Sequence, residues 1–264
     1  MIKNNEIVYL KDKELLSPDH IKTYFDSGFV IVKKLFTKEE VEKLKKYATT
    51  DIEPSQVMVK GDLSGNQTKL RMWNSQQNNL YGMFSRNSRL VDNVEAIFDE
   101  EVYVYSSKMI LKNAKEGGAW EWHQDFGYWY NYGCLMPTMI SCTLAIDAAT
   151  RENGCLQVLR GSQKIGRINH DRVNEQTVVD PEMMEAAKKR FELEYIEMEP
   201  GDVLFFDGNI LHRSDNNNSD FNRWSYIISY NTVSNRPFKK VREYGNYEKL
   251  EKVPTESVLA FTID

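Results

Sequence analysis

The sequence predicts a mainly β fold with flanking helices, of the double-stranded β-helix type, which is a jelly-roll or cupin-like barrel. Two observations lead to this prediction. Helical patterns dominate about the first 100 residues, and short apolar runs of strand length recur between residues 102 and 230. Helices packed around a double-sheet barrel accommodate this order of elements. We therefore expect one domain over residues 1–264, with a helical part at about 1–100, a barrel core at about 101–235 and a tail at 236–264.

Composition and charge restrict the class of protein. Of the 264 residues, 41% are hydrophobic and 28% are charged, which is ordinary for a soluble globular chain. The net charge of −5 argues against a nucleic-acid or anionic-membrane surface, and no uncharged apolar run is long enough to span a membrane. The three cysteines lack metal-site spacing and no apolar leader follows Met1, so we expect a cytoplasmic protein with free thiols. The expected partner is a small molecule, and the chain is expected to be a monomer or a homodimer.

Capping signals place helices in the first part of the chain. Ser17 and Pro18 are typical of the N-cap and first turn of a helix that runs to about residue 28. Residues 37–40 form a capping box for a second helix that runs to about residue 50. A third helical pattern covers residues 87–99, whereas residues 51–85 read as loops with one short strand at 70–73.

From residue 102 the pattern changes to strands. Strand-like runs occupy residues 102–105, 109–111, 120–125, 139–147, 156–159, 195–198, 203–206 and 224–230, and a helix is expected at 181–190. Asn153-Gly154 predicts a hairpin turn between two of these runs. A turn in the polar run 215–220 would pair the strand of His212 with the strand of Arg223 and set these two side chains opposite each other.

The stretch Trp122-His123-Gln124-Asp125 contains two metal-ligand side chains two residues apart. Residues two apart in a strand point to the same face, so His123 and Asp125 could reach one metal ion. His212 follows the strand-like run 203–206 and is the candidate third ligand. Two histidines and one carboxylate, with other positions open, form the facial triad of non-haem Fe(II) oxygenases. On these residues alone, the alternative is a buried polar pair in a sheet.

Five motifs in order resemble the phytanoyl-CoA dioxygenase family, which includes bacterial metabolite hydroxylases such as ectoine hydroxylase. The motifs are His123-Gln124-Asp125 after Gly117-Gly118, residues 153–158, Gly161-Ser162, residues 201–206, and His212 followed by Ser214 and Arg223. The resemblance covers about residues 20–235 and implies a double-stranded β-helix that uses Fe(II), 2-oxoglutarate and O₂. It implies that His123, Asp125 and His212 are the iron ligands and catalytic residues. It also implies that Arg223 binds the distal carboxylate of 2-oxoglutarate, with Ser214 beside it.

The chain departs from the family pattern at two positions. Ser106 stands about where relatives carry a glutamine near 2-oxoglutarate, so Lys112 and Thr143 are further candidates for co-substrate contacts. Gln163 stands where many relatives have histidine, which leaves the substrate open. The expected reaction is hydroxylation of a C–H bond of a small polar metabolite, with release of succinate and CO₂. The alternative is a metal-binding β-barrel that is not an oxygenase, either a zinc hydrolase or isomerase or an idle binding protein.

Five residues are candidate substrate contacts. Strand alternation puts Glu121 on the face of His123, and Trp129 joins it if the strand continues. An acid beside aromatic faces suits an alkylammonium group. The basic stretch that contains Arg160, Arg167 and His170 could meet a carboxylate or phosphonate. These features favour a zwitterion over an acyl-CoA, and the alternatives are a core role for the aromatic residues and a solvated loop for the basic stretch.

Overall fold

The structure, a computed structural model, describes residues 2–11, 14–62, 65–173, 176–240 and 246–263. The helices are α1 (Pro18–Ser27), α2 (Lys38–Asp51), α3 (Leu80–Ser85), α4 (Ser88–Phe98), α5 (Asp125–Trp129), α6 (Pro181–Lys188) and α7 (Ser257–Ala260). The sequence-based helices at 18–28, 38–50, 87–99 and 181–190 are confirmed with small shifts at their ends. Within these described residues, no helix is long and apolar enough to cross a membrane.

Eight strands form one large sheet in the order β1-β2-β12-β7-β14-β5-β4-β3. Their bounds are β1 (Ile7–Val8), β2 (Phe29–Val32), β3 (Met58–Gly61), β4 (Gln67–Trp73), β5 (Val102–Lys112), β7 (Met139–Ala145), β12 (Val203–Asp207) and β14 (Arg223–Thr232). Because β2 pairs with β12, and β4 with β5, the first hundred residues are part of the barrel sheet as well as helical. The expected boundary near residue 100 between a helical part and a barrel core is therefore not observed, because strands from both sides of it form one sheet.

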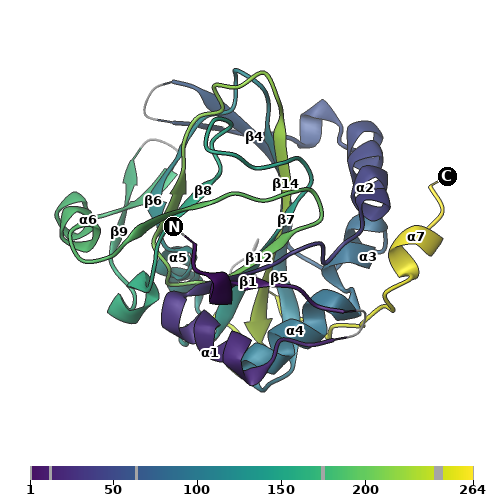
Figure 1. Ribbon diagram of the computed structural model, residues 1–264, viewed down its shortest axis with the longest axis horizontal. Coiled ribbons are helices and arrows are strands. Elements are labelled where there is room, and N and C mark those ends of the chain that lie inside the picture. Colours follow the sequence, from purple (N-terminus) through teal and green to yellow (C-terminus); the bar gives the residue numbers. More distant parts are fainter. Residues whose placement is uncertain (1, 12–13, 63–64, 174–175, 241–245, 264) are drawn as a thin grey trace.

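A smaller sheet faces the large one (Figure 1) and has the order β11-β8-β13-β6. Its strands are β6 (Trp120–His123), β8 (Leu156–Leu159), β11 (Leu193–Ile196) and β13 (His212–Ser214). A separate hairpin joins β9 (His170–Val173) to β10 (Gln176–Val179). Two opposed sheets of mainly antiparallel strands are the arrangement of a jelly roll, as predicted.

Two predicted hairpins are wrong because their strands lie in different sheets. Asn153-Gly154 forms a turn, but it connects β7 of the large sheet to β8 of the small one. Likewise β13 pairs with β6 and β8, whereas β14 pairs with β5 and β7. In the connection between β13 and β14, the Asn217 side chain donates to the carbonyls of Lys112 and Phe221. These local signals identify turns, but the partner of each strand is decided by tertiary packing.

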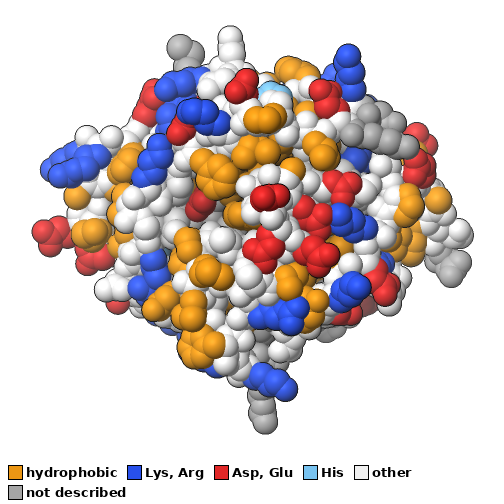
Figure 2. Space-filling view, turned by 90° about the horizontal axis from the view of Figure 1, so that it is seen from below, with side chains coloured by type: hydrophobic (Ala, Val, Ile, Leu, Met, Phe, Trp, Pro, Cys, Tyr) orange, Lys and Arg blue, Asp and Glu red, His pale blue; other side chains and the backbone are white. Residues whose placement is uncertain are grey.

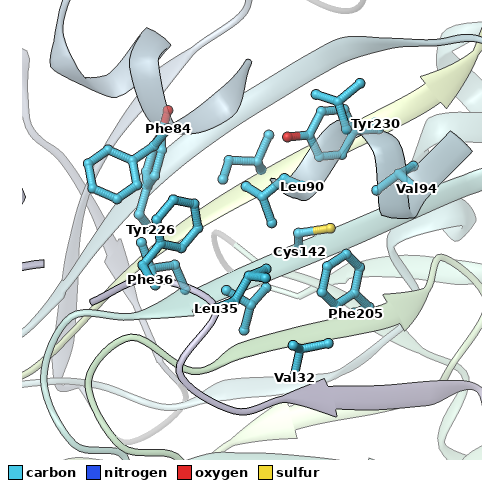
Figure 3. Packing of buried hydrophobic residues seen from close by; sticks show 14 of the residues in the cluster. Val32, Leu35, Phe36, Phe84, Leu90, Val94, Cys142, Phe205, Tyr226 and Tyr230 are labelled. Carbon is cyan, nitrogen blue, oxygen red and sulfur yellow. The ribbon is translucent and has the colours of Figure 1, made fainter. Parts of the chain in front are cut away.

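The main core lies between the outer face of the large sheet and helices α1–α4 and α7 (Figure 1). Figure 3 shows Leu90 and Val94 of α4 next to Tyr230 and above Cys142 and Phe205 of the sheet. The strands alternate between this core and the opposite face. On β14, Tyr226, Ile228 and Tyr230 are buried in the core, while residues 223, 225 and 227 face the small sheet and line a cavity. The three cysteines are buried and free, as expected.

Charged side chains of both signs are mixed on the face of the molecule that Figure 2 shows. On the face in Figure 2, acidic and basic residues are interspersed with hydrophobic ones, and the basic residues do not gather into one continuous patch.

A partly buried carboxyl at the end of β12, that of Asp207, gives a prediction on stability. Burial raises the pKa of Asp207 to about 6, although its oxygen accepts a hydrogen bond from the Asn209 N–H at 2.7 Å. A raised pKa means that the folded state holds the proton more tightly than the unfolded state. The contribution of Asp207 to the free energy of unfolding is therefore fully present below about pH 3.8, and it is lost as the pH rises through about 6.

We predict that Asp207→Asn, which keeps the acceptor oxygen, gains on the order of 2–3 kcal/mol of unfolding free energy over the parent between pH 4 and pH 7. Denaturant unfolding at a series of pH values measures this difference. Asp220→Asn is the control, because Asp220 is exposed. The same difference between parent and Asp207→Asn at every pH would contradict the prediction.

Candidate active site

Three side chains with metal-binding atoms converge between the two sheets. The Nε2 atoms of His123 and His212 lie 3.8 and 4.0 Å from Oδ1 of Asp125, and the three ligand atoms are within 4.8 Å of one another. His123 ends β6 and pairs directly with His212 at the start of β13. Asp125 is not on this strand, because the chain turns at Gln124 and Asp125 begins helix α5. The predicted convergence is therefore observed, but a strand-to-helix turn produces it.

Hydrogen bonds fix which nitrogen of each histidine is free. Nδ1 of His123 lies 2.7 Å from the carbonyl of Glu121, and Nδ1 of His212 lies 3.0 Å from the carbonyl of Ile210. A ring nitrogen beside a carbonyl carries the proton and donates it, so Nε2 keeps its lone pair for a metal. Burial lowers the pKa of both rings, and the neighbouring His212 lowers that of His123 further. Both rings are thus neutral at pH 7, as ligands must be.

Asp125 is the charged member of the group. Burial by itself would raise the pKa of Asp125, but Lys108, the two histidines and the Tyr128 hydroxyl together hold it below its ordinary value. Tyr128 donates to Oδ1, and Ser141 donates to Oδ2 at 2.7 Å. The carboxylate is therefore ionised and oriented. One carboxylate and two neutral imidazoles suit a divalent iron ion.

The residue between the two ligands ties the site to its surroundings. Gln124 is fully buried. Its side chain donates to the carbonyls of Gly166 and Asn209 at 2.8 and 2.7 Å and accepts from the Ile168 N–H at 2.8 Å. Its backbone N–H donates to Nε2 of His170 at 2.8 Å. Gln124 therefore holds the turn between His123 and Asp125 against two other segments of the chain.

A cavity of about 240 Å³ contains the three ligands and extends to Arg223. Arg223 is 6% exposed, and burial lowers the pKa of its guanidinium to about 10. Among the described residues, Nε of Arg223, Oγ1 of Thr143 and Oγ of Ser225 have no hydrogen-bond partner. A buried cation without a partner is costly, and a guanidinium fork matches a carboxylate. This end of the cavity fits one carboxylate of 2-oxoglutarate.

The other two candidates for co-substrate contacts differ in position. Ser214 lines the cavity, whereas Lys112 lies behind it and donates to Oγ of Ser214 at 2.9 Å and to the carbonyl of Asp215. Burial and the nearby Arg223 hold the pKa of Lys112 well below its usual range. Lys112 therefore orients Ser214 and does not face the cavity.

None of the five candidate substrate residues lines the cavity. The strand does not continue to Trp129, which lies on α5 and packs against Tyr105 in the core. Glu121 faces a separate groove that it shares with Arg151 and Arg213. Trp129 is misplaced because the strand ends at His123, whereas Glu121 is misplaced because a register shift between β6 and β13 breaks the alternation of faces before His123.

The candidate residues of the basic stretch also make their contacts with other parts of the protein and not with the cavity. Arg160 is paired with Glu6 and Glu194, and Arg167 lies over the ring of Tyr130 at 4.5 Å. His170 accepts from the Gln124 N–H, and its Nδ1 lies 2.8 Å from the carbonyl of Ile168. Both of its ring nitrogens are therefore used within the protein, and a direct substrate contact is not supported.

The sequence reasoning missed several residues that line the cavity, among them Lys108, Tyr128 and Gln176. Lys108 is four residues before Lys112, a spacing that puts both on one face of a strand, but the strand predicted at 109–111 included neither residue. Tyr128 is three residues after Asp125, a helical spacing that the assumption of a strand concealed. Gln176 arrives with the β9–β10 hairpin and accepts from the Glu121 N–H. No local signal predicts that contact.

Residues 24–225 match the family described as phytanoyl-CoA dioxygenase (PhyH). L-proline trans-4-hydroxylase of Streptomyces griseoviridis is 32% identical over 169 residues, which are 58% of this chain and 63% of that protein. Ectoine dioxygenase of Bordetella bronchiseptica is 26% identical over 252 residues, which are 88% of this chain and 82% of that protein. The crystal structure of EctD from S. alaskensis with 2-oxoglutarate and 5-hydroxyectoine is similar with a TM-score of 0.76 at 22% identity, and the match covers 90% of this chain and 87% of that one.

These similarities confirm the predicted fold class, enzyme type and cofactors, and they favour the oxygenase over the alternative of another metal-binding barrel. The family match covers well over half of the residues. This chain therefore belongs to the phytanoyl-CoA dioxygenase family of non-haem Fe(II)- and 2-oxoglutarate-dependent oxygenases.

Proposed function

We propose that the protein hydroxylates a C–H bond of a small polar metabolite and converts 2-oxoglutarate to succinate and CO₂. The observation that carries this proposal is that the three metal-ligand side chains and the unpaired guanidinium of Arg223 share one cavity. That cavity, at about 240 Å³, is below the ~300–1,000 Å³ typical of sites for drug-sized ligands, which supports a small substrate. The similarity to enzymes named for proline and ectoine supports the same size class.

In this proposal His123, Asp125 and His212 hold the iron, and separate hydrogen bonds orient each of the three side chains. The backbone carbonyls of Glu121 and Ile210 orient the two imidazoles, and the hydroxyls of Tyr128 and Ser141 orient the carboxylate. When bound, iron with 2-oxoglutarate and O₂ supplies the oxidising power for cleavage of the C–H bond. The contribution of the protein is to position the reactants and exclude water.

Arg223 fixes the far end of 2-oxoglutarate. Its guanidinium can bind a carboxylate with two parallel hydrogen bonds, and the Ser214 hydroxyl, which Lys112 orients, lies at the same end. Ser225 and Thr143 supply further unpaired hydroxyls on the cavity wall. Apolar side chains, among them Ile110, Leu156, Phe206 and Ile227, form much of the remaining wall and keep it dry.

We predict that His123→Ala, Asp125→Ala and His212→Ala each abolish the Fe(II)-dependent conversion of 2-oxoglutarate to succinate, because every side chain is needed to hold the metal. Bound iron should fall in parallel, while the circular dichroism spectrum stays that of a folded protein. His20→Ala is the matched control, since His20 caps helix α1 and lies outside the cavity. Full activity at normal iron content in any of the three variants would refute the assignment.

We predict that Arg223→Met raises the KM for 2-oxoglutarate by about 30-fold or more, because loss of a desolvated charged contact costs on the order of 2–5 kcal/mol. Iron binding should be nearly unchanged, since Arg223 is not one of the ligands. Steady-state kinetics with varied 2-oxoglutarate measures the effect. Arg151→Met serves as the control because Arg151 is exposed. An unchanged KM in Arg223→Met would mean that another group holds that carboxylate.

We predict that Gln124→Leu lowers iron affinity although it removes no ligand. The substitution leaves the Gly166 and Asn209 carbonyls and the Ile168 N–H without their partner, at a cost of about 1–3 kcal/mol for each buried group that stays unsatisfied. The turn between His123 and Asp125 should then loosen. Iron titration and thermal unfolding of the apoprotein measure the two effects separately, and an unchanged iron affinity in the folded variant would contradict the role of this side chain.

A further inference from the structure

The inner face of the large sheet connects Arg223 to the metal ligands. Side chains on one face of a strand recur at every second residue, so the register of β5, β14 and β7 divides this face into rows. The first row contains Arg223, the third contains Lys108 and Thr143, and the fourth contains Ser141. Ser141 donates to Asp125. Lys108 is therefore between the residue assigned to the co-substrate and a metal ligand, about 13 Å of strand from the first row and about 7 Å from the fourth.

The first three of these rows present polar atoms that lack a partner. Nε of Arg223, Oγ of Ser225 in the second row and Oγ1 of Thr143 are buried without a hydrogen bond to any described residue. The ammonium group of Lys108 likewise makes no hydrogen bond or ion pair within the part of the chain that the structure describes. All four side chains line the cavity. Because buried polar groups are costly unless they are paired, a ligand that follows these rows is favoured.

The co-substrate has the shape and charge to follow them. A 2-oxo acid chelates a divalent metal through its keto oxygen and the adjacent carboxylate. In 2-oxoglutarate this leaves the distal carboxylate, which is assigned to Arg223 under the proposed function. The molecule then extends from the first row toward Asp125 and passes the row of Lys108. The metal uses one oxygen of the chelating carboxylate, so the other oxygen is left to accept a hydrogen bond.

Lys108 acts on Asp125 through its charge and not through a contact. That charge helps to hold the pKa of Asp125 below its ordinary value. Both carboxylate oxygens, however, already accept hydrogen bonds, one from Tyr128 and the other from Ser141. The ammonium group therefore keeps its N–H donors for another acceptor. It is partly buried, and in such a position a cation is stabilised by a direct anionic partner.

We propose that Lys108 binds the metal-chelating carboxylate of 2-oxoglutarate, so that Arg223 and Lys108 hold the two ends of the dianion. The inference rests on the proposed function and adds a second binding residue to the same site. It has a consequence for the order of the two affinities. The charge of Lys108 attracts the 2-oxo acid but repels a metal cation, so it strengthens binding of the co-substrate without strengthening binding of the metal alone.

The test measures binding without turnover, by calorimetric titration of the Mn(II)-loaded protein in the absence of oxygen. 2-Oxoglutarate is compared with 2-oxobutyrate, which has the same chelating end but no distal carboxylate and is titrated until it saturates the parent. Lys108→Met should raise the Kd of both compounds by about 10-fold or more, because each loses a charge-assisted hydrogen bond. Arg223→Met should raise the Kd of 2-oxoglutarate but change that of 2-oxobutyrate by less than about 3-fold.

Further variants separate a contact from a general effect of charge. Lys108→Arg should keep most of the affinity, because it keeps the charge and the donors, whereas Lys108→Gln is a second neutral variant in case Lys108→Met does not fold. Lys60→Met is the matched control, since Lys60 is also a cavity lysine but is on the edge strand β3, outside these rows. It should change either Kd by less than about 3-fold. Affinity for Mn(II) without a 2-oxo acid should be unchanged or higher in Lys108→Met, and circular dichroism establishes that each variant is folded.

Four results would overturn the inference alone. An unchanged Kd for 2-oxoglutarate in the neutral variants would show that Lys108 makes no contact with it. An effect on 2-oxoglutarate that is absent for 2-oxobutyrate would assign Lys108 to the distal carboxylate. Loss of Mn(II) affinity without a 2-oxo acid would make Lys108 a support of Asp125, and an equal effect in Lys60→Met would show that charge at a distance is responsible. By contrast, failure of the metal-loaded parent to bind 2-oxoglutarate would refute the proposed function together with this inference.

Discussion

The site depends on keeping Asp125 ionised where water is excluded. A buried carboxylate is unstable unless it has hydrogen bonds and opposite charge nearby. Two hydroxyls from different elements, Tyr128 on α5 and Ser141 on β7, donate to its two oxygens, and the ammonium group of Lys108 supplies positive charge in addition to any bound metal. This requirement explains why the large sheet carries polar residues on an inner face that is otherwise apolar. Ser141 is in turn 3.2 Å from Ser229 on the neighbouring strand, which extends the polar network across the sheet.

The position of Asp125 also requires the chain to leave the small sheet immediately after His123. Had β6 continued, Asp125 would share a face with His123 but could not receive the hydroxyl of Tyr128 from the next helical turn. Gln124 makes this change of direction possible, because its side chain satisfies backbone groups of two other segments that the turn leaves without partners. One of these segments contains Asn209, which lies three residues before His212. The same buried amide thus links the segments that carry all three ligands.

These features explain what the sequence could predict. Periodicity and capping identified most helices and strands, and the spacing of His123, Asp125 and His212 within a set of ordered motifs indicated the enzyme family. Which sheet a strand joins was not predictable from turns such as Asn153-Gly154, because pairing is settled by contacts far apart in the chain. For the same reason the residues proposed to contact the substrate were misplaced, whereas Arg223 and Ser214, which also carry the family pattern, do line the cavity. Their chemical roles remain predictions.

In the large sheet, the strands that form the co-substrate end of the cavity are separate from the elements that form its other wall. Arg223, Ser225 and Thr143 lie on central strands β14 and β7, whose opposite faces are packed in the main core, so changes there would disturb both packing and co-substrate binding. The other wall is formed by β3 and β4 at the edge of the sheet, helix α5 and the β9–β10 hairpin. These elements can change with less effect on the core, because they have fewer neighbours to rearrange.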